Sequence, residues 1–436
     1  MAKHISPFDI SLITDRIGSY LTKKDCSNCI LANKTFYNLF KSFLWRNIVN
    51  TQLKPIEDGY KEALLHNGYR IRKLEIVEFK SERLLQFLAG PPAPCKRLLD
   101  FDCTLKGDTE SQELYMSFLD IVEQNTSLQR CTIHRTYGDD AIHVHKRLFK
   151  EEDWKLLVTG LRGRIKSFSA DITQFKPSAG AFVKAMTTHW SETLQVIRIQ
   201  RQVDVLSEEI ELILTTCPNL RTFSVFTTLI EYGRTRGDFN GIKAWIRDDE
   251  ECATADWVCL GLENLELTFL DCRMLYLGCI DEMDPEIEPR YSQLHQEGWT
   301  VKGIQRIYQQ LGRLTKMVHL RIGWHSTDSL YFNANMDMSL KYGLDHLKGL
   351  KKLRVLDISC IRYVKIGQEE VEWMVENWPN LRRIRGLITK TTGRFHGRLG
   401  EFEQLEYDDI PNVCSNPEDR GYIRWLRRMR PHIVIE

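Results

Sequence analysis

The sequence predicts an α/β fold built from a repeated strand–helix unit and preceded by a short all-helical segment. A phrase of the form L-x-x-L-x-L recurs from residue 71 to near the C-terminus. Stretches with a period near 3.6 residues, which is typical of helices, lie between its copies. The first fifty residues lack the phrase and instead carry apolar stripes of helical spacing.

The opening segment is expected to form three short helices. The stripe of the first helix consists of Ile10, Ile13, Ile17 and Leu21, and that of the third consists of Phe36, Leu39, Phe40 and Phe43. Asp25 is placed to cap the second helix. Because about forty residues seldom bury enough surface to fold alone, the segment needs a partner or a neighbouring domain.

The recurring phrase predicts a series of strands whose apolar side chains point into a shared core. Its copies are Ile71-Leu74-Ile76, Leu98-Phe101-Cys103, Leu128-Cys131-Ile133, Ile165-Phe168-Ala170, Leu194-Ile197-Ile199, Leu220-Phe223-Val225, Leu262-Leu265-Leu267, Met317-Leu320-Ile322, Leu353-Leu356-Ile358, Leu381-Ile384 and Phe402-Leu405-Tyr407. Their central positions are separated by 21 to 55 residues, mostly by 26 to 37, which indicates a degenerate leucine-rich-repeat array. We therefore expect a horseshoe-shaped solenoid over residues 51–436, with insertions near 227–261 and 271–303.

Helices between the phrases complete the strand–helix unit. Three of them are marked by the apolar groups Leu114-Phe118-Ile121-Val122, Ile210-Ile213-Leu214 and Val371-Met374-Val375. One repeat buries too few side chains to offset its ordering entropy, so the array must be continuous and its ends must be covered. The opening helices would cover one end. A last helix around Ile423-Trp425-Leu426 and a strand at Ile433-Val434-Ile435 would cover the other.

The two-residue period of a strand predicts which side chains face away from the repeat core. In nearly every phrase they are polar and of mixed charge, which suits recognition of a protein by charge-matched contacts. The candidate target-binding residues on this face are Arg198, Glu266, His319, Arg321 and Asp357.

The opening segment resembles an F-box, the helical module that docks a substrate receptor onto the Skp-family adaptor of cullin-RING ubiquitin ligases. The resemblance is carried by Ile17, Leu21, Asp25, Ala32, Phe36 and Leu44-Trp45, which match the family pattern in order and spacing. The family's opening Leu-Pro falls on Ile10-Ser11, so the proline is either lost or displaced to Pro7. The resemblance implies adaptor binding through Pro7, Ile10, Ile13, Ile17, Leu21, Phe36, Leu44 and Trp45.

A second likeness covers nearly the whole chain. Three segments, Asp256-Trp257-Val258-Cys259, Tyr308 to Thr315 and Trp378-Pro379-Asn380-Leu381, are similar to an F-box-like family expanded in early-diverging fungi. This likeness implies a non-catalytic substrate-recognition subunit of an SCF-type ubiquitin ligase. Its expected partners are the adaptor, the cullin-RING ligase and an unknown target protein. The alternative is a leucine-rich-repeat scaffold that binds proteins without any connection to ubiquitin, its F-box-like head serving only as a hydrophobic end cap.

Composition and motif content narrow the remaining classes of function. Sixty basic and 59 acidic residues leave no global field for nucleic acid, although Arg424, Arg427, Arg428 and Arg430 form a small basic cluster. Neither a signal peptide nor an apolar run long enough to span a membrane is present, so a cytoplasmic or nuclear location is expected. Phosphate-loop, dinucleotide and nucleophile-elbow motifs are absent, and neither Cys26-x-x-Cys29 nor His143-x-His145 has a matching second ligand pair. We therefore expect no enzyme activity, metal or cofactor.

Overall fold

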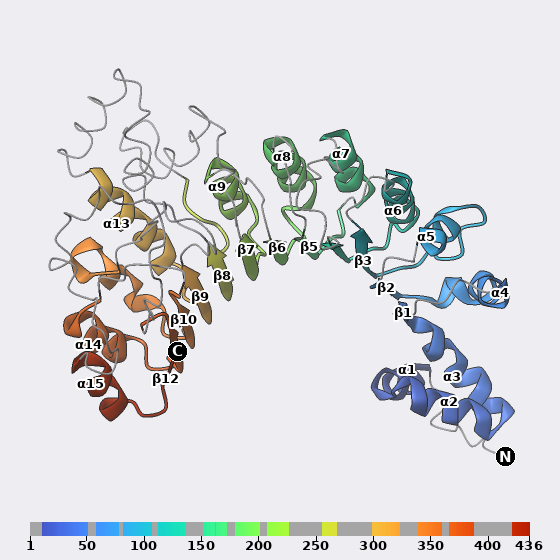
Figure 1. Ribbon diagram of the computed structural model, residues 1–436, viewed down its shortest axis with the longest axis horizontal. Helices are drawn as coiled ribbons and strands as arrows, with labels where there is room; N and C mark the ends of the chain where they lie inside the picture. Colours follow the sequence, from blue (N-terminus) through green and yellow to red (C-terminus); the bar gives the residue numbers. More distant parts are fainter. Residues whose placement is uncertain are drawn as a thin grey trace, which may run out of the picture. The chain divides into compact units, whose positions relative to one another are not determined.

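The computed structural model describes residues 11–50, 58–77, 82–106, 112–136, 151–161, 163–171, 179–200, 207–225, 255–267, 299–322, 338–359, 366–387 and 421–436. The chain forms two compact units, Met1–Ala170 and Asp171–Glu436, which we describe separately. Both are α/β units in which parallel strands follow one another in chain order, with helices between them (Figure 1).

The first unit opens with three helices, α1 (Ser11–Tyr20), α2 (Lys23–Ala32) and α3 (Lys34–Arg46), which we call the head. The N-cap of α2 is Thr22, whose hydroxyl accepts from the Asp25 backbone N–H while the Asp25 carboxylate accepts from the Thr22 backbone N–H. The prediction that Asp25 itself caps this helix is therefore wrong, because Asp25 is the third residue of the helix and closes a capping box. Asn33 caps α3 through Phe36 N–H.

The head leads directly into a parallel sheet. Its strands are β1 (Asn47–Asn50), β2 (Lys73–Ile76), β3 (Asp100–Lys106), β4 (Arg130–Thr136) and β5 (Ser167–Asp171), which ends at the boundary of the unit. The elements between them are α4 (Asp58–Asn67), the 3-10 helix η2 (Gly68–Arg70), α5 (Glu82–Ala89), α6 (Gln112–Gln124) and α7 (Glu151–Gly160). In Figure 1, α5, α6 and α7 form a row along one side of the strands.

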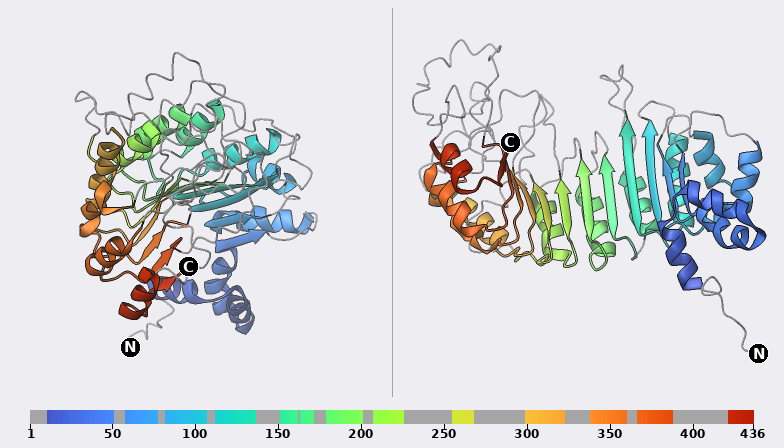
Figure 2. Two further views of the ribbon diagram at one scale, coloured as in Figure 1. Left: turned by 60° about the vertical axis from the view of Figure 1, so that its left-hand side comes forward. Right: turned by 90° about the horizontal axis from the view of Figure 1, so that it is seen from below.

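The second unit repeats this strand–helix alternation. Its strands are β6 (Val196–Gln200), β7 (Thr222–Val225), β8 (Asn264–Leu267), β9 (His319–Ile322), β10 (Val355–Asp357), β11 (Arg383–Arg385) and β12 (Val434–Ile435). The helices are α8 (Ala179–Trp190), α9 (Ser207–Thr216), α13 (Trp299–Gly312), η5 (Leu340–Tyr342), η6 (Leu344–Gly349), α14 (Gln368–Asn377) and α15 (Gly421–Met429). Figure 2 shows the strands of this unit running in the same direction.

The predicted repeat phrases form the core of both units. Ten of the eleven phrases lie in the described residues, and each coincides with a strand from β2 to β11. Their phrase residues are at most 2% exposed. Parallel pairing places the central residue of one phrase beside that of the next, as in Leu74 with Phe101 and Phe101 with Cys131. The phrase at Phe402-Leu405-Tyr407 lies outside the described residues, whereas the predicted last helix and strand are confirmed as α15 and β12.

A backbone hydrogen bond repeats at the same position before successive strands. In the second unit the N–H of Arg221 donates to Gln195 O, that of Glu263 to Arg221 O, and that of Val318 to Glu263 O. Side-chain amides reinforce these steps at two equivalent positions, where Asn219 Nδ2 donates to Glu192 O and Asn380 Nδ2 donates to Lys351 O. Each repeat therefore satisfies backbone groups of its neighbour, which makes the array a solenoid-like stack.

The strand β1 and the helix α4 were not predicted. Ile48 of β1 pairs with Leu74 of β2 and is 9% exposed, so β1 occupies the position of another repeat strand. The phrase is unrecognisable here because the residue beside Ile76 is Asn50 rather than an apolar residue. β1 lies within the first fifty residues but continues the sheet of the residues that follow. The predicted division into a helical domain of residues 1–50 and a repeat domain of residues 51–436 stays a prediction.

Other sequence predictions fall on residues that the structure does not describe. Most of the two insertions and the pair His143 and His145 belong to this group. The seven cysteines in the described residues are free thiols, and all but Cys29 are buried. Burial raises the pKa of Cys95 and of Cys259 to about 12, so these thiols stay protonated near neutral pH.

Candidate functional site: two binding surfaces

The sequence predicted one binding surface in each unit. In the first unit this surface is the apolar exterior of the head. The structure places Ile13 on the outside with 37% of its surface exposed, and Ile17, Leu21, Phe36, Leu44 and Trp45 are half-buried. Pro7 and Ile10 lie outside the described residues.

The interior of the head is small. Phe40 is its main buried side chain, with its ring 5.7 Å from that of Phe36 and 6.0 Å from that of Phe43. Gly18 of α1 lies so close to the Phe43 ring that a Cβ atom there would overlap it. The two helices thus touch through a glycine and an aromatic ring, which allows close approach but buries few large side chains.

Several large apolar side chains on the head face solvent. Leu31 is 83% exposed, Tyr20 72% and Tyr37 47%. Together with Ile13 they lie on all three head helices. An exposed Leu alone needs no explanation, but several large apolar residues on so small a helical unit indicate a surface available to another polypeptide. Tyr20, Leu31 and Tyr37 lie off the apolar stripes, so the helical spacing in the sequence gave no signal for them.

In the second unit the candidate surface is the face of the strands that points away from the repeat core. Parallel register aligns Arg198 of β6, Ser224 of β7, Glu266 of β8, Arg321 of β9 and Asp357 of β10 in one row. Four of the five predicted target-binding residues therefore belong to a single row. The fifth, His319, lies on the same strand as Arg321, two residues earlier.

Hydrogen bonds and close charge contacts form a network among several residues of this face. Ser224 Oγ donates to Glu266 Oε2 at 2.6 Å, and His319 Nδ1 lies 3.9 Å from Glu266 Oε1. Burial lowers the pKa of His319, although the carboxylates of Glu266 and Asp357 act in the opposite direction. His319 therefore favours its neutral form.

Asp357 is the centre of the network. Its Oδ2 atom lies 3.6 Å from both Arg321 Nε and Arg385 Nη1, and its Oδ1 atom accepts from Ser359 Oγ at 2.6 Å. Only 3% of the residue is exposed. The strand alternation predicted that Asp357 would be exposed and could contact a target directly. This prediction of exposure is wrong, because arginines from both neighbouring strands and Ser359 cover the carboxylate.

Three residues outside the predicted set, Arg383, Arg385 and Glu436, extend the network. Arg385 Nε lies 2.8 Å from Glu436 Oε2, and this hydrogen bond raises the pKa of Arg385. Arg383 Nε lies 3.5 Å from the other carboxylate oxygen of Glu436. The alternation of Arg383 and Arg385 in the phrase placed them on this face, but Glu436 is found only through the pairing of β11 with β12.

Among the described residues, the accessible charged side chains of this face are therefore those of Arg198, Glu266, His319, Arg321 and the Arg383–Glu436–Arg385 cluster. The cations outnumber the carboxylates, and several side chains are held by partners that fix their orientation. Such an arrangement suits a polar partner surface recognised by directed, charge-assisted contacts. Within the described residues, no group of three or more potential metal ligands occurs and no helix could span a membrane.

Comparison with known proteins adds a weak structural likeness. No family model matches the sequence, and no curated protein matches it. Among solved structures, the chain resembles a chain of the crystal structure of the Rad7 and Elc1 complex in yeast, at 12% sequence identity and a TM-score of 0.33. That likeness covers 91% of this chain and 97% of the other.

Proposed function

We propose that this chain is a non-catalytic substrate-recognition subunit of an SCF-type ubiquitin ligase. In this proposal the head is an F-box that docks a Skp-family adaptor, and the strand units form a leucine-rich-repeat horseshoe that binds a target protein. The cullin-RING ligase would supply the chemistry. The chain would act in the cytoplasm, the nucleus or both, where such a ligase operates.

The observation that carries the proposal is the apolar exterior of the head. A helical trio that served only as an end cap would turn its large apolar residues inward. Here Leu31 and Tyr20 are more than 70% exposed, while Phe40 is the only large side chain of the head helices below 2% exposure in the described residues. Burying one such side chain against a partner would contribute about 1.5–3 kcal/mol.

The second unit supports a role in binding a partner rather than in chemically modifying it. Its exposed polar side chains lie in register on parallel strands, and several contact one another, as His319 contacts Glu266 and Arg385 pairs with Glu436. Held at a well-matched distance from the ligase, a bound target reaches an effective concentration that is millimolar in order of magnitude, which is enough to speed transfer of ubiquitin. Catalysis by this chain itself is not part of the proposal.

Binding of a purified Skp-family adaptor to the full chain tests the proposal. Leu31→Glu combined with Tyr20→Glu places two charges on the exposed head surface without disturbing the buried Phe40. We expect the double variant to bind the adaptor at least about tenfold more weakly by calorimetry, since even one apolar contact of this size exceeds the energy of a tenfold change.

A matched control separates docking from general loss of solubility or fold. Leu156→Glu changes another exposed leucine, 53% exposed on α7 and outside the head. This variant should bind the adaptor like the parent chain, and all variants should show the same far-ultraviolet circular dichroism. Equal binding by the parent and the head variant, or no binding by the parent, would favour the scaffold without any ubiquitin connection.

A further inference from the structure

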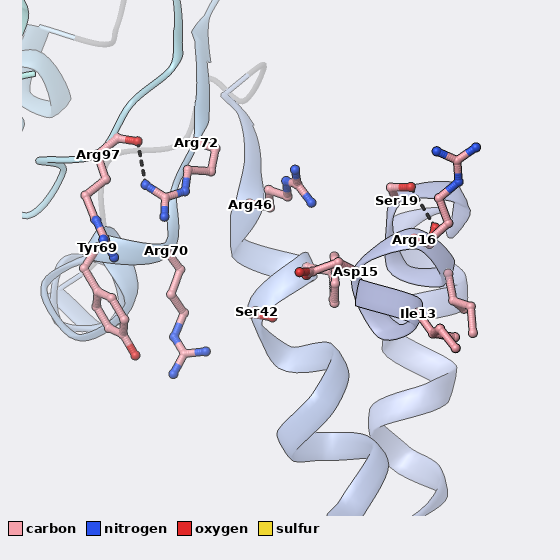
Figure 3. A pocket seen from close by; sticks show the side chains of 12 residues that line it. Ile13, Asp15, Arg16, Ser19, Ser42, Arg46, Tyr69, Arg70, Arg72 and Arg97 are labelled. Carbon is pink, nitrogen blue, oxygen red and sulfur yellow. Dashed lines mark hydrogen bonds between the residues drawn. The ribbon is translucent and has the colours of Figure 1, made fainter. Parts of the chain in front are cut away.

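A second feature of the first unit is a pocket rich in arginine between the head and the first strands. Its volume is about 920 Å³. Arg16 of α1 and Arg46 at the end of α3 contribute to one side, and Arg70 of η2, Arg72 and Arg97 contribute to the other (Figure 3). Among the described residues that line it, Asp15 is the one acidic residue. Five guanidinium groups and one carboxylate leave a surplus of four positive charges around the pocket.

In the part of the chain that the structure describes, the arginines of this pocket have no carboxylate partner. Within the described residues, none of the five makes an ion pair with an aspartate or glutamate, in contrast to Arg385 of the second unit, which is paired with Glu436. The Nε atom of Arg70 is buried and has no hydrogen-bond partner in the described part of the chain. Arginine forks of this kind match oxyanions in geometry as well as in charge.

Contacts with neutral groups hold some of these side chains in place. Arg72 Nη1 donates to the backbone oxygen of Arg97 at 2.9 Å, and the Arg70 guanidinium lies 4.8 Å from the centre of the Tyr69 ring. Burial and then the charges of Arg97 and Arg46 lower the pKa of Arg72. Like charges therefore lie together here with no neutralising carboxylate among the described residues, at a cost that a bound anion would remove.

We propose that this pocket binds an acidic polypeptide segment, one that carries several aspartate or glutamate side chains. Its volume lies at the upper end of the roughly 300–1,000 Å³ typical of ligand pockets, which is more room than a single oxyanion needs. Ile17 and Phe43 also line the pocket. This apolar lining favours a peptide as the ligand, because a peptide can present both polar and apolar groups. With 60 basic and 59 acidic residues, the whole chain has no large net positive charge to attract nucleic acid.

The pocket shares Ile13 and Ile17 with the predicted adaptor surface, yet this inference does not depend on the proposed ligase function. Its test uses no adaptor. The probe is a short fluorescein-labelled peptide of Glu and Asp residues, titrated with the full-length chain at low salt and read by fluorescence anisotropy. A labelled oligothymidylate of equal length and inorganic phosphate serve as competing anions.

Three variants with defined charge changes make the test specific. Arg72→Gln with Arg97→Gln should weaken peptide binding by at least about tenfold, because it removes two of the five guanidinium groups that can form charge-assisted hydrogen bonds with the peptide. Arg164→Gln with Lys166→Gln removes the same charge from exposed positions of the same unit and should leave binding within about twofold. Asp15→Asn should tighten binding, because it removes a negative charge that lines the pocket.

The outcomes decide the proposal. Peptide binding that is lost in the pocket variant, kept in the charge control and strengthened by Asp15→Asn supports it. Failure of the parent chain to bind the peptide overturns it, as does equal weakening by the pocket and control variants. Tighter binding of the oligonucleotide with the same dependence on Arg72 and Arg97 would also overturn it and assign the pocket to nucleic acid instead.

Discussion

Asn125 provides the sharpest stability prediction for the repeat stack. Its side chain is 1% exposed and connects two repeats: Nδ2 donates to Cys95 O and Ile121 O, and Oδ1 accepts from Leu98 N–H, each at 2.9 Å or less. Asn125→Ala would leave Leu98 N–H and Cys95 O buried without these partners. At about 1–3 kcal/mol for each unsatisfied group, the loss is expected to be about 3 kcal/mol.

Hydrogen exchange measures this loss at the affected site. About 3 kcal/mol corresponds to roughly 150-fold faster exchange of the Leu98 amide, if that amide exchanges by opening of this contact. Asn219→Ala removes a single long-range hydrogen bond at an exposed position and should cost under about 1 kcal/mol. If Leu98 exchanges at the parent rate in Asn125→Ala, or if both variants lose the same stability, the side chain does not connect the repeats as described.

Three further predictions concern charged and thiol side chains. Asp357→Ala should destabilise the second unit by about 3 kcal/mol in urea unfolding, because two arginines lose their shared carboxylate, whereas Asp256→Ala, at a mostly exposed carboxylate, should cost under about 1 kcal/mol. Equal costs would contradict this. Because burial lowers the folded pKa of His319, its contribution to stability is complete above the unfolded pKa of about 6.5 and is lost as the pH falls below it. His319→Gln should flatten that part of the stability–pH curve, whereas His189→Gln at an exposed position should not. Among the described cysteines, iodoacetamide should modify the half-buried Cys29 first in the native chain, as read by mass spectrometry. The cysteines expected to resist are Cys95, Cys103, Cys131, Cys217 and Cys259, and early modification of any of them would contradict their burial.

The strands of both units could be predicted because the apolar spacing within each phrase is enough to identify a buried strand without knowledge of its neighbours. In a parallel strand of a stacked array, the three apolar positions of each phrase must be buried whatever lies beside them, and Leu353, Leu356 and Ile358 show this pattern fully. The prediction failed at β1, where Asn50 takes the third position. A single polar residue at the end of the array is tolerated, and the phrase is then no longer visible.

Features that depend on distant partners could not be predicted. The burial of Asp357 comes from Arg321 and Arg385, which lie on the two neighbouring strands, and alternation within one strand cannot reveal such covering. The arginine pocket collects residues from α1, α3, η2 and the segments before β2 and β3. Its visible signal in the sequence was Arg70-x-Arg72, which overlaps the start of a repeat phrase and is too short to stand out in a chain with 60 basic residues.

Adaptor docking through the head is the central claim, and hydrogen–deuterium exchange of the full chain with and without a purified Skp-family adaptor tests it most directly. The account predicts slower exchange on adaptor binding in α1, α2 and α3, with the strands of the second unit unchanged. Peptides that contain Leu31 and Tyr20 should show the effect, because these side chains are exposed in the chain alone. An exchange pattern unaltered in the head at saturating adaptor would contradict the claim.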